Sequence, residues 1–135
     1  MTKAIQQAAK FYARPEVLFE MYMDSKKHSE ATGAPAKIDR RPGGKFTAFG
    51  GQLSGKIQAV VPNKMIVQSW RGPWKANDLD SILVITFKTM DEGTRVDIVH
   101  SNVPEHDHKG VAKGWPKYYW EPWKEYLKRN KKKKS

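Results

Sequence analysis

Apolar and polar residues recur along this chain at spacings that separate helices from strands. Residues 3–12 form a candidate first strand. Residues 14–16, Arg-Pro-Glu, then open a helix, because proline suits the first helical turn and a carboxylate is stabilised at the positive end of the helix dipole. Its apolar stripe comprises Val17, Leu18, Met21 and Tyr22, widened by Phe19 and Met23. A second short helix, capped by Asp24 or Ser25, is expected to end at Gly33.

Between residues 36 and 103 the spacing is typical of strands. The clearest alternation lies in Leu53–Val61, where apolar residues at every second position predict one buried face and one mostly wet face. Turn signals separate the strands at residues 42–44, 50–51, 62–64 and 91–93. The strands are expected at residues 36–40, 45–49, 53–61, 65–71, 81–88 and 94–103. Strands of this length joined by tight turns predict a curved antiparallel sheet.

The C-terminal part of the chain returns to helical spacing. Pro104 ends the sheet, residues 105–113 are expected to be loop-like or briefly helical, and residues 114–116, Gly-Trp-Pro, start a long final helix. Its apolar face comprises Trp115, Tyr119, Trp123, Tyr126 and Leu127. Pro122 removes one backbone hydrogen bond, so we expect a kink near Tyr118. This helix is the element left to cover the concave face of the sheet.

The order of elements predicts an α+β fold in one domain. A curved antiparallel sheet of about six to seven strands wraps on the long C-terminal helix, and two short helices follow the first strand. With 135 residues, the chain has the usual size of one domain. We assign residues 1–130 to this domain. Residues 131–135, Lys-Lys-Lys-Lys-Ser, form a basic tail that is expected to be disordered, because like charges repel one another.

Charge changes this picture little. The formal net charge is +11, but residues 124–135 supply +6 of it, so the body of the domain is only mildly basic. Nucleic acid is therefore not the expected partner, although a polyanion contact through the tail stays open. The chain has no cysteine, which excludes disulfides and thiolate chemistry. We read no secretory signal at the N-terminus and no apolar run long enough for a membrane, so the expected location is the cytoplasm.

Large apolar side chains on the inner faces of the sheet and the helix are candidates for lining a pocket. In residues 94–101 the face of Val96 is expected inward, because the opposite face carries Arg95 and Asp97. We also favour the face of Phe87 as inward, and Trp70 is expected to point inward because Arg71 beside it is better placed in water. The candidate pocket residues are Trp70, Leu83, Ile85, Phe87, Val96, Ile98, His100, Trp115, Tyr119 and Trp123. They either leave gaps that a small apolar, aromatic or lipid-like ligand fills, or pack as a solid core.

Few residues suggest chemistry beyond binding. His100 either hydrogen-bonds a ligand and titrates near neutral pH, or is a neutral histidine satisfied by the backbone or a tyrosine. Residues 106–108, His-Asp-His, have the spacing of a metal pair, but no third ligand is identifiable, so we expect no metal. The carboxylates are scattered, and there is no nucleophile elbow, P-loop or GxGxxG motif. We therefore assign no catalytic residue and no cofactor, and expect no enzyme, with cyclase-like activity a minor alternative.

Several ordered segments resemble one known family. They are residues 28–39 (HSEATGAPAKID), 43–46 (GGKF), 62–71 (PNKMIVQSWR), 100–104 (HSNVP) and Gly114-Trp115, with Trp74 and Ser81 between them. In this order and spacing they are similar to the activator of heat-shock protein 90 ATPase homologue family, a branch of the START / Bet v 1-like helix-grip (SRPBCC) superfamily. The resemblance runs from about residue 8 to residue 128. It implies an antiparallel sheet that grips a long C-terminal helix.

The resemblance also implies a function. It makes this chain a non-catalytic co-chaperone-like domain whose partner is the 90-kDa heat-shock chaperone. In eukaryotic members such a domain follows a separate N-terminal domain that carries much of the ATPase stimulation, so the resemblance implies chaperone binding and leaves stimulation open. The alternative is binding or transport of a small apolar ligand in a central hydrophobic cavity, as in other helix-grip proteins. In either case a monomer is expected.

Overall fold

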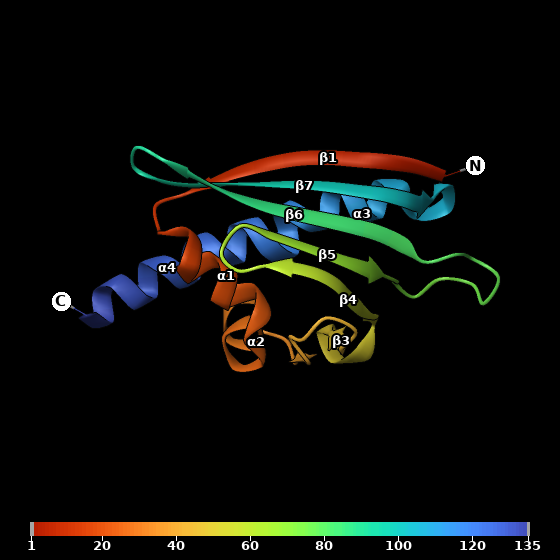
Figure 1. Ribbon diagram of the computed structural model, residues 1–135, viewed down its shortest axis with the longest axis horizontal. Helices are drawn as coiled ribbons and strands as arrows, with labels where there is room; N and C mark the ends of the chain where they lie inside the picture. Colours follow the sequence, from red (N-terminus) through yellow and green to blue (C-terminus); the bar gives the residue numbers. More distant parts are fainter. Residues whose placement is uncertain (1, 135) are drawn as a thin grey trace.

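The chain folds as one seven-stranded antiparallel sheet with the long C-terminal helix packed behind it (Figure 1). The computed structural model describes the backbone of residues 2–134 and the side chains of residues 4–130. The strands are β1 (Thr2–Phe11), β2 (Lys37–Ile38), β3 (Lys45–Ala48), β4 (Leu53–Val61), β5 (Met65–Trp70), β6 (Ser81–Met90) and β7 (Gly93–Pro104). The helical segments are α1 (Pro15–Met23), α2 (Ser25–Thr32), η1 (Phe49–Gly51), η2 (Glu105–Asp107), α3 (His108–Trp115), η3 (Pro116–Trp120) and α4 (Glu121–Lys134). The predicted α+β helix-grip class is confirmed.

The sheet order is β1-β7-β6-β5-β4-β3-β2, so the first strand of the chain pairs with the last. Five consecutive connections build the rest of the sheet in sequence order, and every pairing is antiparallel. In Figure 1 the strands β1, β7, β6 and β5 turn one face towards the viewer with no helix over it. The opposite face carries α3, η3 and α4.

The two short helices begin and end as predicted. Pro15 is the first residue of α1. The Asp24 carboxylate caps α2 by accepting a hydrogen bond from the Lys27 backbone N–H at 2.9 Å. Gly33 ends α2 with φ = 80°, a left-handed conformation that a residue without Cβ adopts at no steric cost.

The prediction for Leu53–Val61 is wrong in its second half. Ile57 is buried, but Ala59 and Val61 are exposed, although strict alternation places them on the same face. The pairing of β4 with β5 shifts register between Ile57 and Ala59. One extra residue in a strand turns every later side chain to the opposite face, and here Val60 packs against the core instead.

The final helical segment starts earlier than predicted. Residues 105–113, expected to be loop-like or briefly helical, form η2 and most of α3, so the helix begins at His108 instead of Gly114. This segment is mostly polar, so its sequence did not indicate an amphipathic helix. Val111 and Trp115 nevertheless lie one turn apart, and both are buried.

A π turn lies where a kink was expected. In η3 the Glu121 backbone N–H donates to the Pro116 carbonyl, five residues earlier. Pro122 has no N–H to donate to the Tyr118 carbonyl, and a wider turn next to it accommodates the proline ring. The extra residue also turns Trp120 into the core, which regular helical spacing did not predict.

The basic tail differs in part from its prediction. α4 continues to Lys134, so the backbone of residues 131–134 is helical. The side chains of residues 131–135 and the whole of Ser135 lie outside the described residues. The expected disorder of this tail stays a prediction, as does its separation from the domain. In residues 2–134, no helix is both long and apolar enough to cross a membrane.

Aromatic rings fill the space between the sheet and the helix. Trp123 is the largest fully buried side chain, and its ring contacts those of Phe11, Tyr22 and Tyr119. Phe19 of α1 packs against Phe87 of β6, with 5.8 Å between the ring centroids. These contacts make the centre of the domain a packed core. Burying one such side chain contributes roughly 1.5–3 kcal/mol to the free energy of folding.

Candidate functional site

A pocket of about 560 Å³ opens beside α3, between the η1 turn and the loop that follows β5. Its apolar wall includes Phe49, Leu53, Trp70, Trp115, Tyr118 and Tyr119. This volume and this mostly apolar lining are typical of sites for small molecules. We refer to it below as the pocket.

All ten candidate pocket residues are buried, with at most 6% of any side chain exposed. Only Trp70, Trp115 and Tyr119 line the pocket. The other seven pack in the core: Leu83, Ile85, Phe87, Val96, Ile98, His100 and Trp123. The pocket therefore lies at one side of the domain, where α3 and η3 come close to the turns, and three of the ten candidates border it. The role of these residues in ligand binding stays a prediction.

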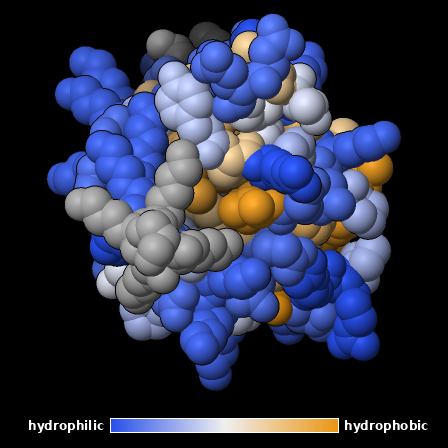
Figure 2. Space-filling view, turned by 90° about the vertical axis from the view of Figure 1, so that its left-hand side faces the viewer, coloured by the Kyte–Doolittle hydropathy of each residue, from blue (hydrophilic) through white to orange (hydrophobic). Residues whose placement is uncertain are grey.

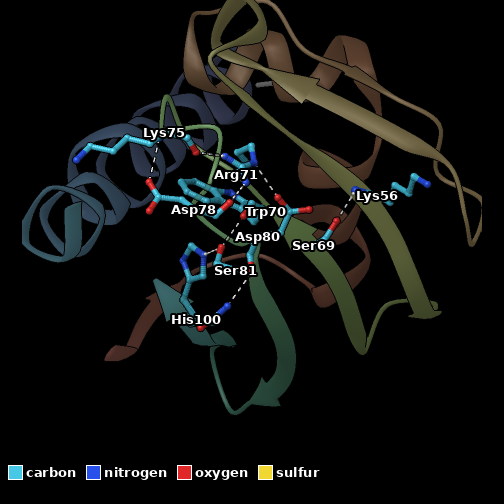
Figure 3. Close-up of polar contacts among 10 residues, drawn as sticks. Lys56, Ser69, Trp70, Arg71, Lys75, Asp78, Asp80, Ser81 and His100 are labelled. Atoms are coloured by element: carbon cyan, nitrogen blue, oxygen red, sulfur yellow. Dashed lines mark hydrogen bonds and ion pairs between the residues drawn. The ribbon is translucent and has the colours of Figure 1, made fainter. Parts of the chain in front are cut away.

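His100 takes part in a chain of hydrogen bonds, of which Figure 3 shows the part that includes Ser81 and Trp70. The Trp115 indole N–H donates to His100 Nδ1 at 3.2 Å. The Ser81 hydroxyl donates to the Trp70 carbonyl at 2.6 Å, so it accepts from His100 Nε2–H at 2.7 Å. This order requires the neutral imidazole with its proton on Nε2. Burial lowers the pKa of His100 to about 3. The histidine is therefore neutral at pH 7, and both ring nitrogens are occupied.

A second buried histidine was missed by sequence reasoning. The His28 Nδ1–H donates to the Tyr22 carbonyl at 2.7 Å, and His28 Nε2 accepts from the Tyr119 hydroxyl at 3.1 Å. Burial lowers the pKa of His28 and raises the pKa of Tyr119. His28 lies on a short helix with a polar sequence, so no pattern of apolar residues marked it as buried. Its hydrogen bond orients Tyr119, which lines the pocket.

Phe49 forms one wall of the pocket in an unusual backbone conformation. Its φ is 53°, in the left-handed region that a bulky side chain rarely adopts. Its ring lies 5.6 Å from that of Tyr118 and 5.7 Å from that of Tyr119, measured between centroids. The two glycines that follow also have positive φ, at 67° and 95°. The sequence marked this glycine pair as a turn but did not indicate that it directs Phe49 over the pocket.

Arg71 holds the loop on the other side of the pocket (Figure 3). Its guanidinium donates to the Asp80 carboxylate at 2.8 Å and to the carbonyls of Lys75 and Asp78. His106 donates to the Asp78 carboxylate at 2.7 Å, and this hydrogen bond lowers the pKa of Asp78. These contacts tie the loop after β5 to η2, so this wall of the pocket is braced by polar contacts.

Asp107 is the acidic group of the pocket. Its Oδ2 accepts a hydrogen bond from the Trp74 indole N–H at 2.7 Å. Residues 106–108 therefore do not converge on a shared point, because His106 bonds to Asp78 and His108 lies 3.4 Å from the Ala4 carbonyl. Among the described residues, no group of three His, Cys, Asp or Glu side chains could hold a metal ion.

Gln68 is a buried amide without a satisfied partner. It has no exposed surface, and neither amide atom makes a hydrogen bond of normal geometry. The amide lies near enough to the Tyr22 hydroxyl to lower its pKa slightly, against the larger effect of burial, which raises it. A buried polar group of this kind costs about 1–3 kcal/mol unless a water satisfies it. Gln68 faces the core on β5, two residues from Trp70, and does not line the pocket.

The uncovered face of the sheet carries a row of cations. Lys10 of β1 pairs with Arg95 of β7, which pairs with Lys88 of β6, and all three side chains are exposed. Like charges directly opposite one another on neighbouring strands are destabilising. Asp97 forms an ion pair with Arg95 at 3.0 Å and neutralises part of the row. We call Lys10, Arg95 and Lys88 the basic row.

Apolar side chains lie farther along the same face, separated from the basic row by Asp97 and Thr86, which are opposite each other. Val99, Val84 and Val67 are directly opposite one another on β7, β6 and β5. Val99 is 38% exposed, and Ile82 beside this row is 41% exposed. A surface that is apolar in the middle and basic at one edge fits a partner surface that is apolar with acidic groups.

Comparisons with known proteins give the chain its relatives. Residues 12–128 match the family described as activator of Hsp90 ATPase homolog 1-like protein. The activator of 90 kDa heat shock protein ATPase homolog 1 of Homo sapiens is 30% identical over 112 residues, which are 82% of this chain and 33% of that protein. The corresponding homolog of Dictyostelium discoideum is 26% identical over 115 residues, 84% of this chain and 30% of that protein. The chain thus spans about a third of the length of these relatives.

Solved structures support the fold. A crystal structure of an HSP90 activator from Plasmodium falciparum superposes with a TM-score of 0.83 at 24% identity, and the match covers 92% of this chain and 95% of that one. A protein from Mesorhizobium loti superposes with a TM-score of 0.82 at 21% identity, covering 94% and 98%. Since these identities are low, the likeness concerns the fold alone.

Proposed function

This chain belongs to the activator of Hsp90 ATPase homolog 1-like family, and we propose that it is a binding domain for the 90-kDa heat-shock chaperone. The observation that carries the proposal is the family match, which extends from the end of β1 into α4. We propose binding instead of catalysis, because the buried histidines are occupied in internal hydrogen bonds. Stimulation of the chaperone ATPase is a further proposal, since the chain matches only about a third of its named relatives. The cytoplasmic location and the monomeric state stay predictions.

We assign the chaperone contact to the uncovered face of the sheet. What supports this choice is that the basic row and the row of Val99, Val84 and Val67 share one uncovered face. Like charges opposite one another lower stability, so a role in binding would account for the basic row. The occupant that fits is an acidic surface of the chaperone with apolar groups at its centre. The C-terminal helical segment lies behind the sheet in Figure 1, so such a partner reaches this face without rearranging the domain.

The test is a titration of isotope-labelled domain with the 90-kDa heat-shock protein, followed by NMR and by calorimetry. Amide shifts should concentrate on β1, β7 and β6. The Lys88→Glu variant should weaken binding at least tenfold, while its free energy of unfolding stays the same or rises, because the new carboxylate lies opposite Arg95. Lys26→Glu makes the same charge change on α2, where the side chain is also exposed, and should bind as the parent does.

Two results would count against this proposal. If no amide shifts appear at high chaperone concentration, the domain does not bind the chaperone. If shifts appear but concentrate on α2 and α4, and Lys88→Glu binds normally, the chaperone uses the helical side.

The pocket supports a second function, the binding of a small apolar or aromatic ligand. Its volume of about 560 Å³ and its aromatic wall are the observations that favour it. A flat aromatic probe such as naphthylmethanol should raise the melting temperature of the domain. Tyr118→Ala should weaken this binding and leave chaperone binding unchanged, since Tyr118 lines the pocket, is 47% exposed and contributes little to the core. Absence of any stabilisation at millimolar probe would contradict this function.

A further inference from the structure

The charge of the pocket lining is opposite to that of the chain. The chain has 25 lysines and arginines and 14 aspartates and glutamates. Among the described residues that line the pocket, none is a lysine or arginine, and the one charged residue is Asp107. A lining of this size in so basic a protein would ordinarily include several cations. The lining itself therefore has no cationic side chain to pair with a carboxylate or phosphate on a ligand, although the Lys117 ammonium lies 5.2 Å from the centroid of the Tyr118 ring.

The Asp107 carboxylate is free to accept another hydrogen bond on its pocket side. Trp74 donates to Oδ2, and in the described part of the chain no hydrogen bond reaches Oδ1. Oδ1 leans over the first turn of α3, since a Cβ built on Gly110 would lie 2.5 Å from it. Gly110 also lines the pocket, so the carboxylate lies at the edge of the same space.

Two glycines on α3 leave this space open. Gly110 and Gly114 lie one helical turn apart and both line the pocket. A glycine inside a helix costs about 1 kcal/mol compared with alanine. At Gly114 an added Cβ would lie 3.5 Å from the Tyr118 ring, an ordinary contact, so packing does not exclude alanine. The glycine adds room to the pocket at a cost in helix stability.

From these three observations we propose that the pocket binds flat aromatic molecules that carry a positive charge, such as an alkylammonium group on a fused ring. The ring lies against Trp115, Tyr118 and Phe49, and the ammonium group donates to Asp107 Oδ1 at the pocket edge. Electron-rich ring faces add to the attraction for the cation. This inference rests on the ligand-binding function proposed above, and it names the ligand class of that site.

The experiment uses three probes with one ring and three charges: naphthylmethylammonium, naphthylmethanol and naphthylacetate. Binding to the full chain is measured by calorimetry at low salt and followed by NMR. The ammonium probe should bind at least tenfold more tightly than naphthylacetate, with naphthylmethanol between them. The net charge of +11 attracts the anionic probe and repels the ammonium probe. A preference for the ammonium probe must therefore come from the pocket itself.

Two variants test the assigned residues. Asp107→Asn keeps an acceptor for the Trp74 indole and should lower affinity for the ammonium probe about tenfold, with naphthylmethanol changed less than twofold. Lys113→Gln changes the charge by one unit on the exposed side of α3 and should leave the preference intact. Gly114→Ala should keep or raise the melting temperature while it weakens binding of all three probes at least threefold, which a merely structural glycine would not do.

The outcomes separate this inference from the functions on which it rests. Tighter or equal binding of naphthylacetate, or an Asp107→Asn variant that keeps the preference, would overturn the ligand class while leaving the pocket as a site. If none of the three probes binds, both the ligand-binding function and this inference fail. Chaperone binding is unaffected by either result, because it is measured through Lys88→Glu on the other face of the sheet.

Discussion

Two hollows lie along the C-terminal helical segment, and they differ in charge more than in size. The pocket beside α3 has about 560 Å³, and a groove of about 720 Å³ lies between the end of β1, the start of α1 and α4. Figure 2 views the end of the molecule where α4 finishes, with apolar residues gathered among hydrophilic ones. The groove is lined by Lys10, Lys124 and Lys128 together with two glutamates. The pocket lining has no such cations among the described residues.

The comparison indicates that volume does not identify a site in this protein. The groove lies at the edge of an amphipathic helix, where half-buried Leu127 and exposed lysines line the same hollow. Lysines at such an edge cover apolar surface with their stems and keep their charges in water. The pocket depends on the side chain that is missing from α3 at Gly114, and on a strained Phe49. Features that cost stability without improving packing are better evidence for binding than an apolar hollow is.

The largest difference should appear in stability. Trp115→Ala at the floor of the pocket should lower the free energy of unfolding by about 3–5 kcal/mol, because the indole is 2% exposed and its N–H satisfies His100. Leu127→Ala at the groove is half-buried and should cost about 1–2 kcal/mol. Urea denaturation of both variants measures this. Equal costs would mean that the two ends of the helix are packed alike.

A change of intermediate size in the free energy of unfolding should appear when the pH is lowered. Both buried histidines lie at the end of the helical segment that borders the pocket. The pKa of folded His100 is lowered to about 3 from an ordinary value of 6.5, so the unfolded chain binds more protons between these values. Stability is therefore full above pH 6.5 and falls as the pH drops, by up to about 1.4 kcal/mol per pH unit. The lowered pKa of His28 adds in the same direction.

Urea denaturation at several values between pH 7 and pH 5 checks this dependence, in a range above most carboxylate titration. A His100→Gln variant is less stable at pH 7 but should lose less stability on acidification than the parent. A parent stability that stays constant over this range would contradict the assignment of neutral, buried histidines.

The smallest effect should appear in the charges of the groove. The Lys124 ammonium lies 3.7 Å from the Glu121 carboxylate in an exposed pair. Such pairs contribute little, so Lys124→Ala should change the free energy of unfolding by less than about 0.5 kcal/mol. Thermal denaturation at low and high salt measures the change. A loss above 1 kcal/mol would show that the groove charges are structural and that the two hollows are more alike than we infer.

Much of the fold follows from local patterns. Pro15, Asp24 and Gly33 mark helix ends because proline geometry, capping and left-handed φ are properties of single residues. The register shift in β4 could not be predicted, because alternating side chains do not reveal where a partner strand skips a residue. The burial of Trp120 depends in the same way on a π turn that the spacing does not show.

For the candidate site, the sequence identified the buried aromatic set but not the pocket. Trp70, Trp115 and Tyr119 were recognised because large apolar side chains recur on predicted inner faces. Phe49, Asp107 and the two α3 glycines were not, since each comes from a turn or a polar segment. Their role becomes visible only when η1, the loop after β5 and α3 meet.

Apolar periodicity and turn residues were therefore enough to determine the order of elements, the inward faces of β6 and β7, and the aromatic face of the final helix. These features depend on neighbours within one or two turns of the chain. Tertiary structure decided which of the aromatic residues border open space, which histidines are satisfied, and that the pocket lining has a carboxylate and no cation among the described residues. Those properties depend on contacts between segments as distant as Trp74 and Asp107, which local patterns do not encode.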